Sequence, residues 1–194
     1  MIYWDSENKQ IMTSLCRSCP DDYFAPYSQD LQHVGCCSYS PVFSLYEIWK
    51  MVKSGKREFF IKRIYENADR TLAEYEVVVH AYVHNSYEHI TRDQFLSKTE
   101  LTDWKLKFSV CQFFVEGKGC GLDPYFKNSV CRSFICSAVE EQLGNEDQDH
   151  LKEWVRLIRL ESETFNEHHK KILHRKAWSL EHHMPQILDY LQTI

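Results

Sequence analysis

The sequence lacks any long hydrophobic run. No window approaches the roughly 18 consecutive apolar residues that a membrane-spanning helix needs. Residues 1–10 also lack a basic stretch followed by an apolar one, which is the pattern of a cleaved secretory leader. We therefore expect a soluble protein of the cytoplasm.

The short motifs of common enzyme classes are also missing. The sequence contains no nucleophile elbow, glycine-rich phosphate loop or dinucleotide-binding fingerprint, which argues against a hydrolase, a kinase or a dehydrogenase. Its net charge of −5 favours neither nucleic acid nor an anionic membrane as a partner. No segment is repeated, and no low-complexity linker divides the chain.

Ten histidines are present, but no His-Glu-x-x-His element. If the segment around residue 80 is helical, His80 and His84 share one face at i, i+4 spacing and can hold a metal ion. The alternative is that these histidines are solvated or lie in the core and bind no metal.

What the chain does have is eight cysteines in two groups. The upstream group is a Cys-x-x-Cys turn and an adjacent pair, and the downstream group places four thiols in 26 residues: Cys16, Cys19, Cys36, Cys37, Cys111, Cys120, Cys131 and Cys136. A chain of 194 residues with 43% hydrophobic residues can build a packed core without disulfides. In a reducing compartment, clustered cysteines are metal ligands or redox-active thiols more often than disulfides. We therefore take all eight as candidate metal ligands, with thiol redox chemistry and plain burial as the alternatives.

Local spacing suggests how these thiols are presented. Cys16 and Cys19 can both reach one tetrahedral ion or one cluster edge. Cys36 and Cys37 point to opposite faces if the segment is extended, so one is expected to ligate while the other packs, bridges to a second ion or acts as a resolving thiol. The turn at residues 116–119 predicts a hairpin that carries Cys111 and Cys120 on facing arms. The neighbouring Arg132 either offsets thiolate charge or forms a surface salt bridge.

Hydrophobic periodicity predicts a mainly α-helical α+β fold. Ser44 and Glu47 form a capping box before a helix over residues 44–54, and a second helix is expected over residues 57–75. Residues 77–83 suit either a strand or a continuation of that helix, and Thr91 with Gln94 resembles a further cap. Amphipathic helices follow from about residue 147, with a break at Pro185.

We divide the chain into a cysteine-cluster metal-binding domain, residues 1–140, and a helical C-terminal extension packed on it, residues 141–194. The expected core is compact and cysteine-ligated. The amphipathic helices of the extension are the expected surface for another protein.

The cysteine pattern resembles the YkgJ-like Cys-x-x-Cys-x-x-Cys-Cys family of zinc- or iron-chelating domains, which is related to the cysteine-rich part of flagellin lysine N-methylases. The matching segments are Cys16-x2-Cys19, Cys36-Cys37, Cys111-Gln112-Phe113-Phe114, Gly119-Cys120 and Cys131-Arg132-Ser133-Phe134. Two departures stand out: sixteen residues separate Cys19 from Cys36 where the family usually has two, and Asn128-Ser129 replaces an Arg-Pro pair. The resemblance implies an iron–sulfur cluster or zinc, and in the methylase-like relatives a four-iron cluster.

We therefore expect a metal-binding protein that holds a [4Fe–4S] cluster or Zn²⁺. The preferred ligands are Cys111, Cys120, Cys131 and one upstream thiol. Aromatic residues near these cysteines can shield a cluster from solvent and so favour an iron–sulfur cluster over zinc. They are Phe113, Phe114 and Phe134. The alternatives are a lysine methylase-like enzyme, a thiol redox sensor, and a zinc-stapled interaction module. No catalytic constellation is identified.

Overall fold

The computed structural model describes residues 2–91 and 97–194. Helices make up 53% of the structure, and the strands form small antiparallel sheets, so the mixed α+β class is confirmed. None of the described helices is both long and apolar enough to cross a membrane.

The sheets of the described residues are short. They comprise a hairpin near the N-terminus, a three-stranded sheet of order β3-β5-β4, and two separate pairs of two-residue strands. The strands are β1 (Ile2–Asp5), β2 (Gln10–Thr13), β3 (Val42–Ser44), β4 (Arg70–Leu72), β5 (Glu76–Val79), β6 (Tyr82–Val83), β7 (Ser109–Val110), β8 (Phe114–Val115) and β9 (Gly119–Cys120).

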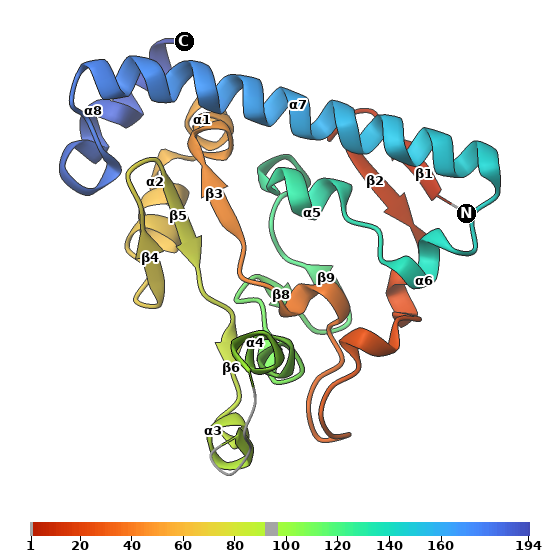
Figure 1. The fold of residues 1–194 in the computed structure, drawn as a ribbon. Helices are drawn as coiled ribbons and strands as arrows, with labels where there is room; N and C mark the ends of the chain where they lie inside the picture. The colour runs from red at the N-terminus through yellow and green to blue at the C-terminus, as the bar shows by residue number, and fades with distance from the viewer. Residues whose placement is uncertain (1, 92–96) are drawn as a thin grey trace.

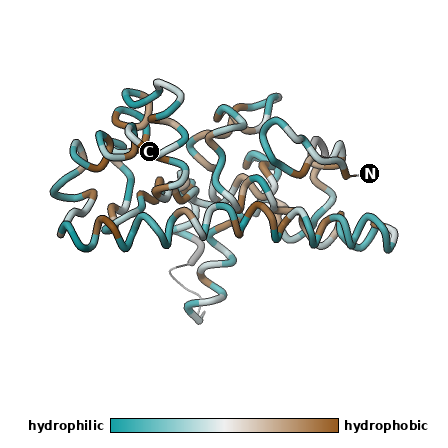
Figure 2. The backbone as a smooth tube through the Cα atoms, turned by 90° about the horizontal axis from the view of Figure 1, so that it is seen from above, coloured by the Kyte–Doolittle hydropathy of each residue, from teal (hydrophilic) through white to brown (hydrophobic). Residues whose placement is uncertain are grey.

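One long helix organises the others. The helix α7 crosses the whole width of the molecule (Figure 1) and is largely hydrophilic, with hydrophobic turns at intervals (Figure 2). The α-helices are α1 (Leu45–Lys53), α2 (Arg57–Phe60), α3 (Ser86–Thr91), α4 (Lys98–Leu106), α5 (Ser129–Ser133), α6 (Ser137–Glu140), α7 (Asn145–Arg175) and α8 (Leu180–Thr193). Tighter or wider turns are η1 (Ser14–Ser18), η2 (Asp22–Phe24), η3 (Gly35–Ser38), η4 (Ile61–Tyr65) and η5 (Pro124–Phe126).

Two hydrophobic cores lie under this helix. The larger core packs α1 and α8 against the three-stranded sheet and includes Phe113 and Leu122 from the cysteine-rich region. The smaller core joins β1, β2 and α6 to the N-terminal half of α7. Because α7 contributes to both, it holds the N-terminal cysteine segments and the α1 region in one framework.

The capping box predicted before α1 is confirmed. The backbone N–H of Ser44 donates to the Glu47 carboxylate at 3.0 Å, and the Ser44 hydroxyl donates to the same oxygen. Asn166 of α7 extends this cap, because its side-chain oxygen accepts from the Tyr46 N–H at 2.9 Å and its amide donates to the Ser44 hydroxyl. The start of α1 is therefore fixed from two sides.

The helix predicted over residues 57–75 is wrong beyond Tyr65. The chain turns after η4, where the Asn67 side chain accepts from the Asp69 N–H at 2.9 Å, and then enters β4. Residues 70–72 pair in register with Val77–Val79, so the β-branched run forms a strand and draws the preceding segment into its sheet. Periodicity alone could not show this, because the pairing is a contact between segments.

Three further local predictions concern the hairpin before Cys120, the last helix and the cap at Thr91. The hairpin is confirmed, with Phe114 opposite Cys120 and Val115 opposite Gly119, but Cys111 precedes β8 and does not face Cys120 across it. The last helix begins earlier than expected, because α8 starts at Leu180 and contains Pro185 after a non-helical residue at His183. The cap expected at Thr91 and Gln94 extends outside the described residues.

We expect Leu173→Ala to lower the free energy of unfolding by about 2–5 kcal/mol, because it opens a cavity in the larger core. The matched control is Leu160→Ala on the same helix, which should change it by less than about 0.5 kcal/mol. Leu173 is 0% exposed and Leu160 is 50% exposed. Urea denaturation of both variants measures the difference, and equal losses would contradict this packing of α7.

Candidate thiol centre

Eight cysteines lie on four segments of the structure, and all are free thiols. Cys16 lies in η1 with Cys19 directly after it, and Cys36 and Cys37 lie in η3. Cys111 precedes β8 and Cys120 ends β9, while α5 carries Cys131 and Cys136 caps α6. Figure 1 shows η3, the β8–β9 hairpin and α5 in the middle of the molecule, below α7.

Four of these thiols, Cys37, Cys111, Cys120 and Cys131, form what we call the hairpin thiol cluster. The backbone joins two of its segments, because the Cys111 N–H donates to the Cys37 carbonyl at 2.6 Å. The Asn128 side chain caps α5 by accepting from the Cys131 N–H at 2.7 Å. The upstream cysteine of the hairpin thiol cluster is therefore Cys37 and not Cys36.

The members of the hairpin thiol cluster act on one another electrostatically. Burial raises the pKa of Cys131 to about 12, and the thiols of Cys120, Cys111 and Cys37 raise it as well, although part of the residue is open to solvent. Burial raises the pKa of Cys111 to about 11, with contributions from Cys37 and Cys120, and it also raises the pKa of Cys120, with a contribution from Cys37. In each of the six pairs, one thiol raises the pKa of the other. Four thiolates in this place need a nearby cation to be stable.

Backbone amides already point at two of the sulfurs. The N–H groups of Phe113 and Phe114 donate to Cys111, and the Leu122 N–H donates to Cys120; each lowers the pKa of its thiol. Amide donors of this kind orient and stabilise thiolate ligands. The positive φ of Gly119, +88°, lets the hairpin make this turn beside Cys120.

The positive charge near these thiols comes from Lys127 and not from Arg132. The Lys127 ammonium lowers the pKa of Cys37, Cys120 and Cys131. Arg132 is buried and turns away. Its Nη1 donates to the Lys9 carbonyl at 3.3 Å and lies 3.9 Å from the Glu161 carboxylate. Arg132 was expected either to offset thiolate charge or to form a surface salt bridge. It does neither, because it forms a buried ion pair.

The remaining thiols, Cys16, Cys19, Cys36 and Cys136, form a second group that we call the N-terminal thiol cluster. Cys19, Cys36 and Cys136 belong to the smaller hydrophobic core, whereas Cys111 and Cys120 pack against the larger one. The adjacent cysteines of η3 are thus divided between the clusters, as suggested for an extended segment, although η3 is a 3₁₀ turn. The clusters meet at this pair, because a hydrogen bond between the Cys36 and Cys37 thiols lowers the pKa of Cys37 to about 7 and raises that of Cys36.

The thiols lie in the same region but do not form a complete metal-binding site. Among the described cysteine, histidine, aspartate and glutamate side chains, no three are arranged around one point as ligands of a metal ion. Rotation about the Cα–Cβ bond moves a sulfur while the backbone stays in place. The thiols and their amide donors have the chemistry of thiolate ligands, but the described side chains are not arranged around one ion.

The histidines offered as an alternative metal pair do not share a helix. His80 and His84 flank β6, so the i, i+4 geometry is wrong. The His80 ring contacts the Thr71 hydroxyl at 2.8 Å, and His84 Nδ1 contacts the Ser86 hydroxyl at 2.7 Å.

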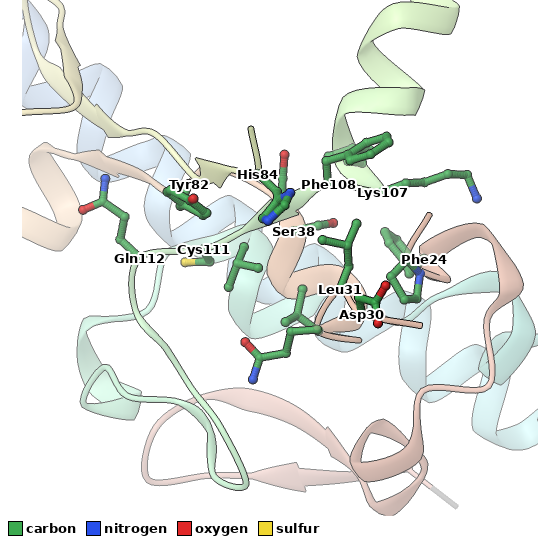
Figure 3. Close-up of a pocket in the computed structure, with 16 residues that line it drawn as sticks. Phe24, Asp30, Leu31, Ser38, Tyr82, His84, Lys107, Phe108, Cys111 and Gln112 are labelled. Carbon is green, nitrogen blue, oxygen red and sulfur yellow. The ribbon is translucent and has the colours of Figure 1, made fainter. Parts of the chain in front are cut away.

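A cavity of about 350 Å³ adjoins the hairpin thiol cluster. Cys111 and Gln112 lie on one side of it, and Phe108, His84 and Tyr82 lie along the top of the view in Figure 3. The Ser38 hydroxyl, next in sequence to Cys37, is buried there without a hydrogen-bond partner within the described residues. A small molecule in this cavity would lie directly beside Cys111.

Sequence reasoning missed a buried polar cluster behind α5. Lys50 is 1% exposed, donates to the Lys127 carbonyl at 3.3 Å, and lies 4.8 Å from the ring centre of Tyr46 and 5.2 Å from that of Tyr125. Burial, together with the Arg132 charge, lowers its pKa to about 7. A lysine on an apolar helix face gives no sequence signal of burial, because such side chains are usually solvated.

Comparisons with models of protein families, with curated proteins and with solved structures found no match.

We expect the free energy of unfolding to rise with pH above about 7 because of Lys50. Its pKa is about 7 in the folded chain against an ordinary value of 10.5 for lysine, so the unfolded chain binds more protons between these two pH values. The contribution is at most about 1.4 kcal/mol per pH unit.

Lys50→Met should lack this rise, whereas the exposed control Lys56→Met should keep it. Urea denaturation of wild type and the two variants at pH 7, 8 and 9, at equal metal content, measures the free energy of unfolding of each. The difference between wild type and each variant at each pH checks this prediction. Parallel pH profiles for wild type and Lys50→Met would show that the Lys50 ammonium is not desolvated.

Proposed function

We propose that the protein is a cysteine-ligated metal-binding protein whose main centre is the hairpin thiol cluster. One observation carries the proposal: the Cys111 N–H donates to the Cys37 carbonyl at 2.6 Å, which joins the η3 turn to the segment before the β8–β9 hairpin. Burial, with smaller contributions from neighbouring thiols, raises the pKa of Cys111, Cys120 and Cys131 in the same region. Folding brings together groups whose negative charges repel, and a bound cation is the general means of relieving that repulsion. The YkgJ-like resemblance, with its implied iron or zinc, agrees with this reading.

We propose an iron–sulfur cluster rather than zinc, because aromatic side chains near the thiols can shield a cluster from solvent. Zinc takes four sulfurs about 2.3 Å from a single point, whereas a [4Fe–4S] cluster takes its four thiolates on four different irons. Such a cluster would supply one-electron chemistry, whereas zinc would supply rigidity.

The aromatic residues around the centre contribute unequally to its shielding. Phe113 is buried and packs edge-on against Phe43 at 5.7 Å between ring centres, so it closes the apolar side of the site. Phe134 is partly exposed and packs against Phe24 of the other core. The site therefore has one apolar wall and one more open side near Cys131.

Thiol redox chemistry is a second candidate, and the Cys36–Cys37 hydrogen bond is the observation that favours it. The lowered pKa of Cys37 gives it thiolate character at neutral pH, which is what a reactive thiol needs. A methylase-like activity would need a substrate site, and the cavity beside Cys111 is the feature that supports it. The exposed Leu157 and Leu160 of α7 are where we propose a protein partner binds.

Metal and acid-labile sulfide analysis of protein purified without oxygen tests the main proposal. We expect iron and sulfide in equal amounts, with a visible absorption that bleaches on reduction and is lost in Cys120→Ser. The matched control is Glu116→Ala at the exposed turn of the same hairpin, which should keep both. If the wild-type protein is colourless and contains zinc, and Cys120→Ser loses that zinc, the centre is a structural zinc site.

A Cys120→Ser protein that keeps the metal content of wild type would contradict the proposal. A metal-free wild-type protein whose Cys36 and Cys37 cycle between dithiol and disulfide would favour the redox candidate. Circular dichroism of each variant separates metal loss from unfolding, since structural metal sites stabilise the fold.

A further inference from the structure

We propose that the cavity beside Cys111 is a binding site for a small uncharged molecule with a flat apolar body and one carbonyl oxygen. The volume of the cavity is about 350 Å³, at the lower end of the roughly 300–1,000 Å³ of small-molecule sites in proteins. The proposal does not depend on whether the neighbouring thiols bind a metal.

Much of the cavity wall is apolar. Phe24, Leu31 and Val34 line it from the segment between η2 and η3, and Phe108 lines it from the turn after α4. Phe108 is 2% exposed, and its ring stacks on that of Tyr27 with 4.8 Å between ring centres. Because packing fixes this aromatic ring, the wall suits a flat apolar ligand.

The Ser38 hydroxyl is the group in the cavity that most directly indicates a ligand. Ser38 is 4% exposed, and its oxygen has no hydrogen-bond partner among the described residues. A buried polar group without a partner is costly, so such groups in folded proteins nearly always have one. Ser109 lines the same cavity, but its hydroxyl already donates to the Lys105 carbonyl at 2.6 Å. A ligand oxygen would supply the partner that Ser38 lacks.

The His84 ring offers a second donor. The Ser86 backbone N–H donates to His84 Nδ1 at 3.3 Å, so Nδ1 is an acceptor and the neutral ring carries its proton on Nε2. In Figure 3 the ring lies next to Ser38 in the middle of the view. A carbonyl oxygen has two lone pairs, so it can accept from the Ser38 hydroxyl and the His84 Nε2–H together.

The charges around the cavity favour an uncharged ligand. Its lining includes one acidic side chain, Asp30, and one basic side chain, Lys107, so the two charges balance. Lys107 extends away from Ser38 (Figure 3). A carboxylate placed beside Ser38 would therefore lose its water without pairing with that ammonium, which is unfavourable.

A ligand-observed NMR titration of the full-length protein tests the proposal with two probes. The probes are 1-tetralone and tetralin, which lacks only the carbonyl oxygen. We expect wild type to bind 1-tetralone about two- to tenfold more tightly, which is the usual net gain from one hydrogen bond.

Ser38→Ala should lose this preference and keep its affinity for tetralin. The substitution removes a hydroxyl without a described partner, so it leaves no known partner group unpaired. The matched control is Ser109→Ala, which should keep the preference because that hydroxyl bonds to Lys105. An unchanged preference for 1-tetralone in Ser38→Ala would overturn the proposal. Tighter binding of the charged probe 1-naphthoate than of 1-tetralone would overturn it as well.

A cavity-filling variant shows where the probes bind. Val34→Phe places a larger side chain in the cavity and should abolish binding of both probes, with circular dichroism as the check on folding. Unchanged binding of both probes would place them elsewhere and overturn the proposal. Because these titrations measure only ligand binding, a protein found to hold no metal would contradict the proposed centre and leave this site standing.

Discussion

The burial of cysteine thiols near one another is the constraint on which the proposed centre depends. Burial raises the pKa of Cys16, Cys111, Cys120 and Cys131, and neighbouring thiols add to each of these shifts, whereas the pKa of Cys37 is lowered by the Cys36 thiol. Amide donors at Cys111, Cys120 and Cys136, and the ammonium of Lys127, offset only part of that cost. We propose that a bound cation offsets the cost of ionising these thiols. The metal-binding proposal follows from this cost, whereas the redox candidate depends on the hydrogen bond between the Cys36 and Cys37 thiols.

The rest of the chain holds the cysteine segments in position. Helix α7 joins the two hydrophobic cores, and each core carries one thiol cluster at its edge. The η3 turn lies between them, so the division of Cys36 and Cys37 is the point where both cores and both clusters meet. Behind α5, the buried Arg132 and Lys50 fix the helix that presents Cys131, through the Lys9 and Lys127 carbonyls. The site is therefore supported by apolar packing on two sides and a polar cluster on the third.

The sequence predicted those parts of the fold whose signals are local. The capping box of Ser44 and Glu47, the hairpin before Cys120 and the long C-terminal helix all depend on residues a few positions apart, and all were found. The helix beyond Tyr65 was wrong because Arg70–Leu72 pairs with a strand. The choice of Cys37 over Cys36 in the hairpin cluster, the approach of Cys19 to Gly35 and the burial of Arg132 could not be predicted, because each is set by contacts between distant segments.

X-ray absorption at the K-edge of the bound metal tests the central claim most directly, because it reports the atoms in contact with the ion. For protein purified without oxygen, the account predicts a coordination shell made of sulfur, at about 2.3 Å for zinc. In Cys131→Ser, that shell should lose sulfur. A shell dominated by nitrogen or oxygen in the wild-type protein would contradict the claim that these thiols are the ligands.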